Sequence, residues 1–229
     1  MTAAVVPGPS LPDVSALSVG LLGGTGPQGR GLGRRLAAAG HAVTLGRRDA
    51  GRAAEAAAPL AAEGLPVTGT DNVGAARCDV VIVAVPYDGH RALLEGLADT
   101  LAGRIIVDCV NPLGFDAKGA FVLPVEAGSA ALEAAAALPG SRVVAAFHHV
   151  SAVLLEDPAV TSFDSDVLVL GDDRAATDTV QALAARIPGM RGVYAGRLRN
   201  AAQVEALTAN LISVNRRYQA HAGVRVTDV

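Results

Sequence analysis

The sequence contains no tryptophan, a single lysine and two cysteines, and no apolar run in it is long enough to cross a bilayer. Aromatic residues make up 3% of a chain that is 51% hydrophobic, so we expect an aliphatic core of alanine, valine and leucine. The two cysteines, Cys78 and Cys109, are too few for a disulfide framework, and we expect both to be reduced packing residues. These absences favour a soluble, cytoplasmic protein that does not enter a membrane.

The chain also lacks an excess of positive charge. Its net charge of −3 argues against a general nucleic-acid binder, so an anionic ligand must be met by local clusters of arginine. Residues 1–16 have no basic region and carry three prolines, and we expect a flexible tail there and not a signal peptide.

The most informative stretch is 18–29, in which a short apolar run leads into a glycine-rich turn and then a helical pattern. Gly24, Gly26 and Gly29 have G-x-G-x-x-G spacing, which permits a tight turn, close approach to a pyrophosphate, and close packing of helix on strand. Pro27 suits the first helical turn, where a backbone N–H has no intrahelical partner. The stretch therefore predicts a strand, a phosphate-binding loop and a helix.

A pair of arginines follows the second predicted strand, residues 41–45. In dinucleotide-binding folds an acidic residue at this place takes the ribose 2′-hydroxyl of NAD, whereas arginine accommodates the 2′-phosphate of NADP. Arg47 and Arg48 occupy the position, so NADP is favoured; a solvated basic turn is the alternative. We expect Asp49 to cap the next helix and Arg52, in its first turn, to face the same end of the cofactor.

Apolar strand patterns and helical patterns alternate along the rest of the chain, which predicts an α/β fold with a doubly wound parallel (Rossmann) sheet. Three regions are expected: a tail (1–16), an NADP-binding Rossmann domain (17–150), and a smaller C-terminal region (151–229) that completes the sheet and covers the cleft. Residues 113–125 are rich in glycine and proline and predict a loop.

Several predicted strands end in a corner where a ligand is expected, because ligands of open parallel sheets lie beyond the carboxyl ends of the strands. Pro86 and Tyr87 form one such corner, beside the nicotinamide half of the dinucleotide, although Tyr87 could equally shield the core. Asn111 and Pro112 form another, and the asparagine amide offers both donors and an acceptor.

The pair His148 and His149 follows the sixth predicted strand. Because neighbouring strand residues point to opposite faces and no further ligand lies nearby, we expect no metal site. One histidine could be packed and the other on the rim, but a role in lining the substrate pocket is favoured.

No Ser-His-Asp set, Walker loop or dehydrogenase acid/base motif is recognisable. An alcohol substrate would need a proton acceptor, whereas hydride transfer between two stacked rings would not, because each carrier performs its own chemistry. We therefore assign no catalytic residue.

Five segments together resemble one family, the reductases that exchange hydride between NADP and the 8-hydroxy-5-deazaflavin coenzyme F420. The segments are Gly23–Gly26, Gly46–Arg48, Pro86–Tyr87, Val144–Ser151 and Glu205–Ile212. The resemblance runs from Ser18 to the C-terminus.

By that resemblance each cofactor has its own set of residues. Those implied for the pyrophosphate are Thr25, Gly26, Pro27 and Gln28; for the 2′-phosphate, Arg47, Arg48 and Arg52; for the nicotinamide, Tyr87, Asn111 and Ala152; and for the deazaflavin, Leu207. Our expected deazaflavin pocket also includes His148, His149 and Ser151.

Two other functions stay open on the sequence alone. The electron acceptor could be a flavin, an imine or a metal chelate, or the protein could bind NADP as a sensor without turnover. The last predicted helix, Asn200–Tyr218, carries an apolar stripe that suggests a wall of the cleft or the interface of a homodimer.

Overall fold

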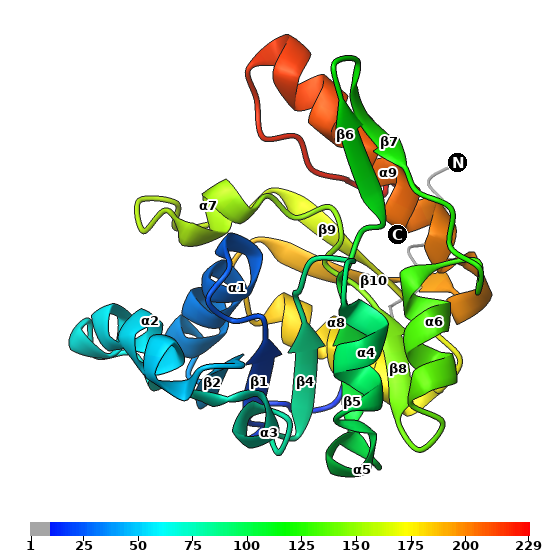
Figure 1. Ribbon diagram of the computed structural model, residues 1–229. Helices are drawn as coiled ribbons and strands as arrows, with labels where there is room; N and C mark the ends of the chain where they lie inside the picture. Colours follow the sequence, from blue (N-terminus) through cyan, green and yellow to red (C-terminus); the bar gives the residue numbers. More distant parts are fainter. Residues whose placement is uncertain (1–9) are drawn as a thin grey trace.

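The computed structural model describes residues 10–229, which form an eight-stranded sheet with helices on both faces (Figure 1). The strand order is β10-β9-β8-β5-β4-β1-β2-β3. Strands β2 and β3 therefore lie on one side of β1, and the strands from β4 onward lie on its other side. The strands are β1 (Val19–Leu22), β2 (Val43–Arg47), β3 (Val67–Asp71), β4 (Val80–Val83), β5 (Ile105–Asp108), β8 (Arg142–Ala145), β9 (Ser165–Gly171) and β10 (Met190–Gly196).

Alternate side chains of these strands enter two separate cores, one on each face of the sheet. Leu21 and Ile82 pack in one core and Leu22 and Val83 in the other. The α-helices are α1 (Pro27–Ala38), α2 (Ala50–Ala62), α3 (Asn72–Ala75), α4 (His90–Glu95), α5 (Ala98–Leu101), α6 (Ala130–Ala137), α7 (Ala152–Glu156), α8 (Arg174–Ala185) and α9 (Ala201–Tyr218). The expected aliphatic core is confirmed, since the largest fully buried side chains are leucines, isoleucines and one phenylalanine, Phe147.

The expected doubly wound α/β fold is confirmed, but the sheet is not parallel throughout. Strand β9 runs antiparallel to β8, with Ala145 opposite Leu170. The chain between these strands forms only the short helix α7 and turns back beside β8 without crossing to the opposite edge of the sheet. The beginning of β9 therefore extends past the carboxyl end of β8, toward the side where ligands are expected.

The prediction of a loop over residues 113–125 is wrong. The segment forms a hairpin of two four-residue strands, β6 (Leu113–Asp116) and β7 (Gly119–Val122). In Figure 1 the hairpin projects away from the large sheet, alongside the second half of α9. Both strands are half-buried at most, so no alternation of buried and exposed positions marks them in the sequence.

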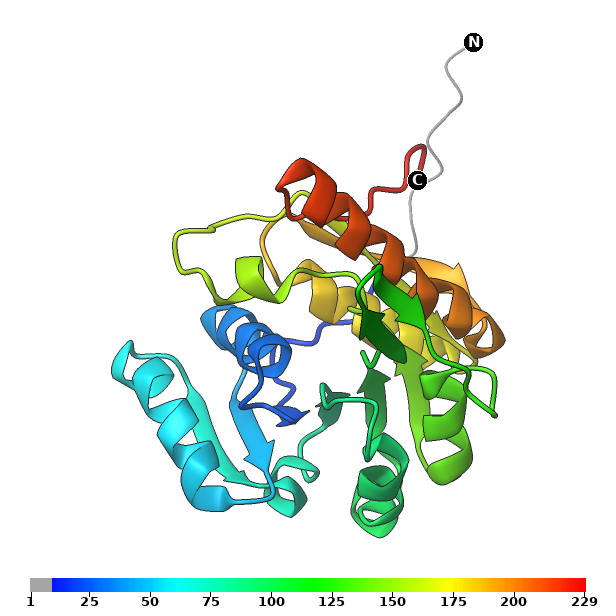
Figure 2. The same cartoon turned by 45° about the horizontal axis from the view of Figure 1, so that its top comes forward.

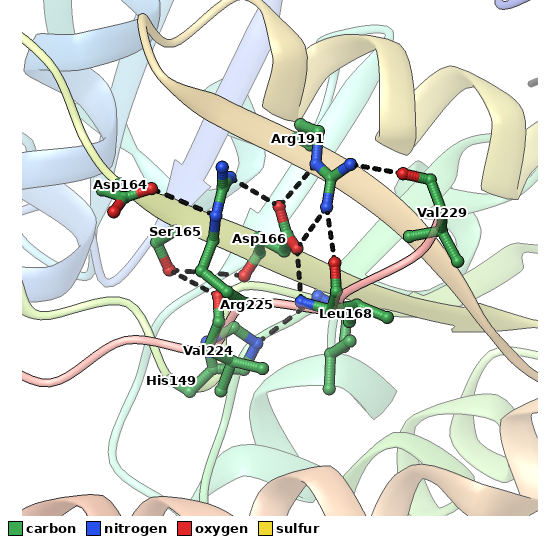
Figure 3. Close-up of polar contacts among 10 residues, drawn as sticks. His149, Asp164, Ser165, Asp166, Leu168, Arg191, Val224, Arg225 and Val229 are labelled. Carbon is green, nitrogen blue, oxygen red and sulfur yellow. Dashed lines mark hydrogen bonds and ion pairs between the residues drawn. The ribbon is translucent and has the colours of Figure 1, made fainter. Parts of the chain in front are cut away.

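The C-terminal segment turns back from α9 and is tied to the start of β9 (Figure 3). Asp166, which is buried, accepts hydrogen bonds from the side chains of Arg191 and Arg225 and from the amide of Val226. This tie fixes the segment that follows α9. Helix α9 itself lies across the top of the molecule in Figure 2.

Residues 1–9 of the expected tail lie outside the described residues. Within residues 10–16 the expectation of a free tail differs from the structure, because Val14 is buried and Leu11 packs against the core. Apolar side chains draw this part of the segment onto the sheet.

Candidate functional site

The glycine loop connects β1 to α1 at the carboxyl edge of the sheet. Gly23 has φ of +78°, and the amide of Gly24 donates to the carbonyls of Leu21 and Gly46, each at 3.1 Å. A Cβ atom on Gly29 would lie 2.7 Å from the Gly23 oxygen, so only glycine lets the helix approach the turn this closely. The first-turn amides of α1 have no intrahelical acceptor and point toward any anion bound at the loop.

A cavity of about 630 Å³, here called the arginine cavity, lies between the glycine loop and the end of β2. Arg47, Arg48 and Arg52 line it together with Thr25 and Gly26. Nη1 of Arg47 donates a 3.1 Å hydrogen bond to Oγ1 of Thr25. The cavity thus offers three cations and a hydroxyl to a phosphorylated ligand.

Helix α2 holds Arg52 in place. The side chain of Asp49 accepts a 3.1 Å hydrogen bond from the Arg52 amide, which confirms the expected cap of this helix.

A second cavity, of about 410 Å³, lies beyond the ends of β4, β5 and β8 and is called the histidine cavity. His148 and His149 both line it because they lie in a turn past the end of β8, where side chains no longer alternate between faces. Phe147, which precedes them, has φ of +63°, an uncommon conformation for a bulky residue. Its carbonyl accepts a 3.2 Å hydrogen bond from Nε2 of Gln28.

Both histidines are buried and uncharged at neutral pH. Burial lowers the pKa of His148 to about 4. The pKa of His149 is also lowered to about 4, mainly by burial and to a smaller extent by the neighbouring His148. Within residues 10–229, both ring nitrogens of His148 and Nδ1 of His149 have no hydrogen-bond partner. Buried polar atoms of this kind are normally satisfied, so they suit a polar ligand in the cavity.

Helix α9 closes the histidine cavity through Thr208. The Thr208 hydroxyl donates to the carbonyl of His148 at 3.1 Å and lies 3.4 Å from Oδ1 of Asn111. Nδ2 of Asn111 donates to the same His148 carbonyl at 2.9 Å. These bonds join the ends of β5 and β8 to the covering helix.

A third cavity, of about 970 Å³, lies between the Pro86–Tyr87 corner and the hairpin and is called the tyrosine cavity. Its apolar wall includes Leu113, Phe115 and Ile212. Tyr87 is half-buried, and its hydroxyl donates to Oε2 of Glu133 at 3.4 Å.

The three cavities adjoin one another. Ala84 and Val85 line both the arginine and the histidine cavity. Asn111, Thr208 and Ile212 line both the histidine and the tyrosine cavity. A trough therefore runs along the carboxyl edge of the sheet, from the arginine turn to the hairpin.

Most of the site residues expected from the sequence line this trough. They are Thr25, Gly26, Gln28, Arg47, Arg48, Arg52, Pro86, Tyr87, Asn111, His148, His149, Ser151 and Ala152.

Five expected site residues line none of the three cavities: Gly24, Pro27, Gly29, Pro112 and Leu207. The glycines and Pro27 shape the loop, with Pro27 as the first residue of α1. Helix α9 presents Thr208, Leu211 and Ile212 to the trough, and a contact of Leu207 with the deazaflavin stays a prediction.

Sequence reasoning missed a buried polar cluster beside the tyrosine cavity. His90, which is fully buried, lies between Asp108 and Glu133. Neither the histidine nor the carboxylates belong to a recognisable motif, and 18 and 43 positions along the chain separate His90 from its two partners.

A family model described as "NADP oxidoreductase coenzyme F420-dependent" matches residues 18–112, which include the glycine loop, the arginine turn and the Pro86–Tyr87 corner. The F420-dependent NADP reductase of Methanothermobacter marburgensis is 36% identical over 223 residues, covering 93% of this chain and 99% of the relative. The chain belongs to the F420-dependent NADP reductase family.

Two further comparisons extend the relationship over the whole family fold. The F420-dependent NADP reductase of Methanocaldococcus jannaschii is 34% identical over 93% of this chain and 99% of its own. A crystal structure from Arthrobacter sp. FB24, described as a candidate F420-dependent NADP reductase, matches with a TM-score of 0.79 and 27% identity, covering 93% of this chain and 100% of that one.

Two other properties bear on the site. In the described part of the chain no helix combines the length and apolarity that a bilayer crossing requires. Among residues 10–229 no three histidine, cysteine or acidic side chains are grouped so that they could hold a metal ion.

Proposed function

We propose that this member of the F420-dependent NADP reductase family transfers hydride directly between NADP(H) and coenzyme F420. The observation that carries the proposal is the meeting of the histidine and tyrosine cavities at Asn111, Thr208 and Ile212, next to the arginine cavity. Two ring systems can lie against each other there. One of them would be the nicotinamide of NADP, and the rest of that dinucleotide would extend to the arginines.

The NADP end of the trough fits the cofactor by the chemistry of its donors. The pyrophosphate would lie on the loop of Thr25, Gly26, Pro27 and Gln28, where Gly24 and Gly29 allow close approach. Arg47, Arg48 and Arg52 would hold the 2′-phosphate, because a guanidinium group gives parallel hydrogen bonds to phosphate oxygens.

The nicotinamide would occupy the histidine cavity, with Asn111 and Ala152 beside it and Pro86 at the passage to the arginine cavity. The unpartnered nitrogens of His148 and His149 would then meet polar ring edges. The deazaflavin would lie on the other side of the shared wall, against Tyr87 and the apolar hairpin, with α9 as its cover. This proposal exchanges two roles expected from the sequence, because His148, His149 and Ser151 line the cavity given to the nicotinamide and Tyr87 lines the cavity given to the deazaflavin.

The protein's part in the reaction is to orient the rings and exclude water. Hydride passes from one ring carbon to another when the two are held in contact, and this step requires no side-chain nucleophile or base. Helix α9, joined by Thr208 to the end of β8, would cover the meeting place of the cavities.

The assay mixes the purified protein with NADPH and oxidised coenzyme F420 and follows the absorbance of the deazaflavin. We expect the absorbance to bleach with NADPH and much more slowly with NADH. No bleaching at any pH between 5 and 9 would contradict the proposal. A flavin, an imine and a ferric chelate serve as competing acceptors, and tight NADP binding without any acceptor would indicate a sensor.

The domain division, the location in the cell and the oligomeric state are proposed together with this function. The chain would divide into an NADP-binding domain (17–150) and a covering region (151–229), and it would act in the cytoplasm, where its two buried cysteines stay free. It would also form a homodimer through the exposed apolar side chains of the hairpin and the end of α9, Phe115, Phe121, Val122 and Tyr218. Light scattering after size exclusion tests the dimer, and Phe115→Asp should shift it to monomer.

A further inference from the structure

His90 faces a carboxylate with each of its ring nitrogens. Nε2 lies 2.6 Å from Oδ2 of Asp108, and Nδ1 lies 3.2 Å from Oε1 of Glu133. An ionised carboxylate only accepts hydrogen bonds, so both contacts are satisfied together when both nitrogens of His90 carry a proton. The geometry therefore holds His90 as an imidazolium inside the protein.

This buried cation is connected to the tyrosine cavity. Glu133 accepts from the Tyr87 hydroxyl through its other oxygen, at 3.4 Å, and both Glu133 and Tyr87 line the cavity. A chain of hydrogen bonds thus runs from Asp108 at the end of β5, through His90 on α4 and Glu133 on α6, to the wall of the tyrosine cavity, where the deazaflavin would lie.

The other ionisable groups around His90 come from several elements. Glu205 on α9 is buried and interacts with both His90 and Asp108, His148 interacts with Asp108, and Arg91 next to His90 interacts with Glu133. Burial by itself would lower the pKa of His90, but the hydrogen bonds and charges of Asp108 and Glu133 together raise it.

The reaction proposed above does not balance with hydride alone. NADPH loses a hydride and becomes NADP, whereas the oxidised deazaflavin gains that hydride at a ring carbon and a proton at a ring nitrogen. One proton is therefore consumed for each hydride in this direction and released in the other. A group that exchanges this proton has to lie within reach of the deazaflavin, and Glu133 is an ionisable side chain in the wall of the tyrosine cavity.

We propose that His90 stores this proton and that Glu133, held by Tyr87, passes it between His90 and the deazaflavin in the tyrosine cavity. This inference rests on the proposed function. In the reducing direction His90 gives its Nδ1 proton to Glu133, which gives a proton to the ring nitrogen, directly or through the Tyr87 hydroxyl. Solvent then restores the proton to the His90 and Glu133 pair after product leaves.

The experiment compares Glu133→Gln and Tyr87→Phe with Glu126→Gln, which changes an exposed carboxylate outside the cluster. We expect Glu133→Gln to slow deazaflavin reduction about 100-fold and to change the solvent deuterium isotope effect. Loss of the Glu133 charge also lowers the pKa of His90, so the alkaline fall of the rate should move to lower pH. Glu126→Gln should match the wild type in all three measurements.

A second measurement does not depend on turnover. The chemical shifts of the ring C–H protons of His90 are followed by NMR as a function of pH in the ligand-free protein. We expect the midpoint of the His90 titration to move to lower pH in Glu133→Gln and to stay unchanged in Glu126→Gln. If Glu133→Gln fails to fold, Tyr87→Phe supplies the kinetic comparison. A wild-type enzyme that turns over while Glu133→Gln keeps its rate, pH profile and isotope effect would overturn the inference alone. A wild type that does not reduce the deazaflavin would overturn the proposed function instead.

Discussion

Arg47 reaches from the end of β2 to the glycine loop, where its Nη1 donates to Oγ1 of Thr25 at 3.1 Å. This bond ties the turn that would recognise the 2′-phosphate to the loop that would hold the pyrophosphate. Arg48 and Arg52 line the same cavity without such an anchor among the described residues. Arg47 is therefore the arginine that the structure orients in advance.

Replacement of Arg47 by Gln should raise the KM for NADP about tenfold or more, since a charge-assisted hydrogen bond contributes about 1.5–3 kcal/mol. The kcat at saturating NADP should change little, because the arginine lies far from the meeting place of the rings. Steady-state kinetics with NADPH and NADH measure both values. Arg52→Gln is the matched variant, and we expect it to raise the KM for NADP less than Arg47→Gln does. An unchanged KM for NADP in the double variant of Arg47 and Arg48 would show that this turn does not bind the 2′-phosphate.

The loop itself should tolerate a methyl group at one glycine and not at another. In Gly29→Ala the new Cβ would lie 2.7 Å from the Gly23 oxygen, and we expect a loss of about 1–3 kcal/mol in unfolding free energy. In Gly26→Ala the nearest atom is at 3.4 Å, an ordinary contact, and the stability should stay close to that of the wild type. Thermal and urea unfolding without ligand compare the two, and equal stability of the variants would contradict the packing argument.

Glu205 should make the stability of the protein depend on pH. Its buried carboxylate accepts from the amides of Ala130 and Ala131 at 2.9 and 3.1 Å, and burial raises its pKa to about 7 from the 4.5 of a free glutamate. A raised pKa means that the folded state binds the proton more tightly. The stabilisation is therefore complete below about pH 4.5 and is lost as the pH rises through about 7.

In Glu205→Gln this dependence should disappear. The difference in unfolding free energy between wild type and variant should change by about 3 kcal/mol between pH 4.5 and pH 8, measured by urea unfolding. Glu126→Gln, an exposed control, should follow the wild type at every pH. A constant difference between Glu205→Gln and wild type would show that Glu205 does not titrate in this range.

The tie between Asp166 and the C-terminal segment should stabilise the segment that follows α9. Arg191 donates two hydrogen bonds of 2.8 Å to the buried Asp166 carboxylate (Figure 3). Both arginines that pair with Asp166 are partly exposed. We therefore expect Asp166→Asn to lower the unfolding free energy by about 2 kcal/mol, less than the loss of a fully buried ion pair would. Hydrogen exchange should also become faster in the segment after α9.

Asp164→Asn is the control, because Asp164 is exposed and contacts only one of the two arginines, Arg225. The pKa of Asp166 is lowered to about 2, chiefly by the hydrogen bonds from Arg191. The stability from this tie is therefore present above about pH 3.8 and is lost as the pH falls toward 2. Equal hydrogen exchange in the two variants would contradict a role of Asp166 in fixing the segment.

The local features of the site were predictable. Gly24, Gly26 and Gly29 act through their spacing, and the apolar run of β4 reads as a buried strand, because both signals depend on residues within a few positions of one another. Asp49 as a helix cap is also a local interaction. The hairpin was not predictable, since its strands are short and half-exposed, and its stability comes from the contact with α9.

By itself the sequence determined the α/β class, the glycine loop, the arginine turn and the family, because each is written in neighbouring residues or in one short motif. Only the tertiary structure decided that Thr208 closes on His148 from 60 positions away and that His90 lies between Asp108 and Glu133. It also decided that the trough divides into three adjoining cavities. These contacts join residues from separate elements, and their partners are set by how helices pack on the sheet, which no spacing along the chain encodes.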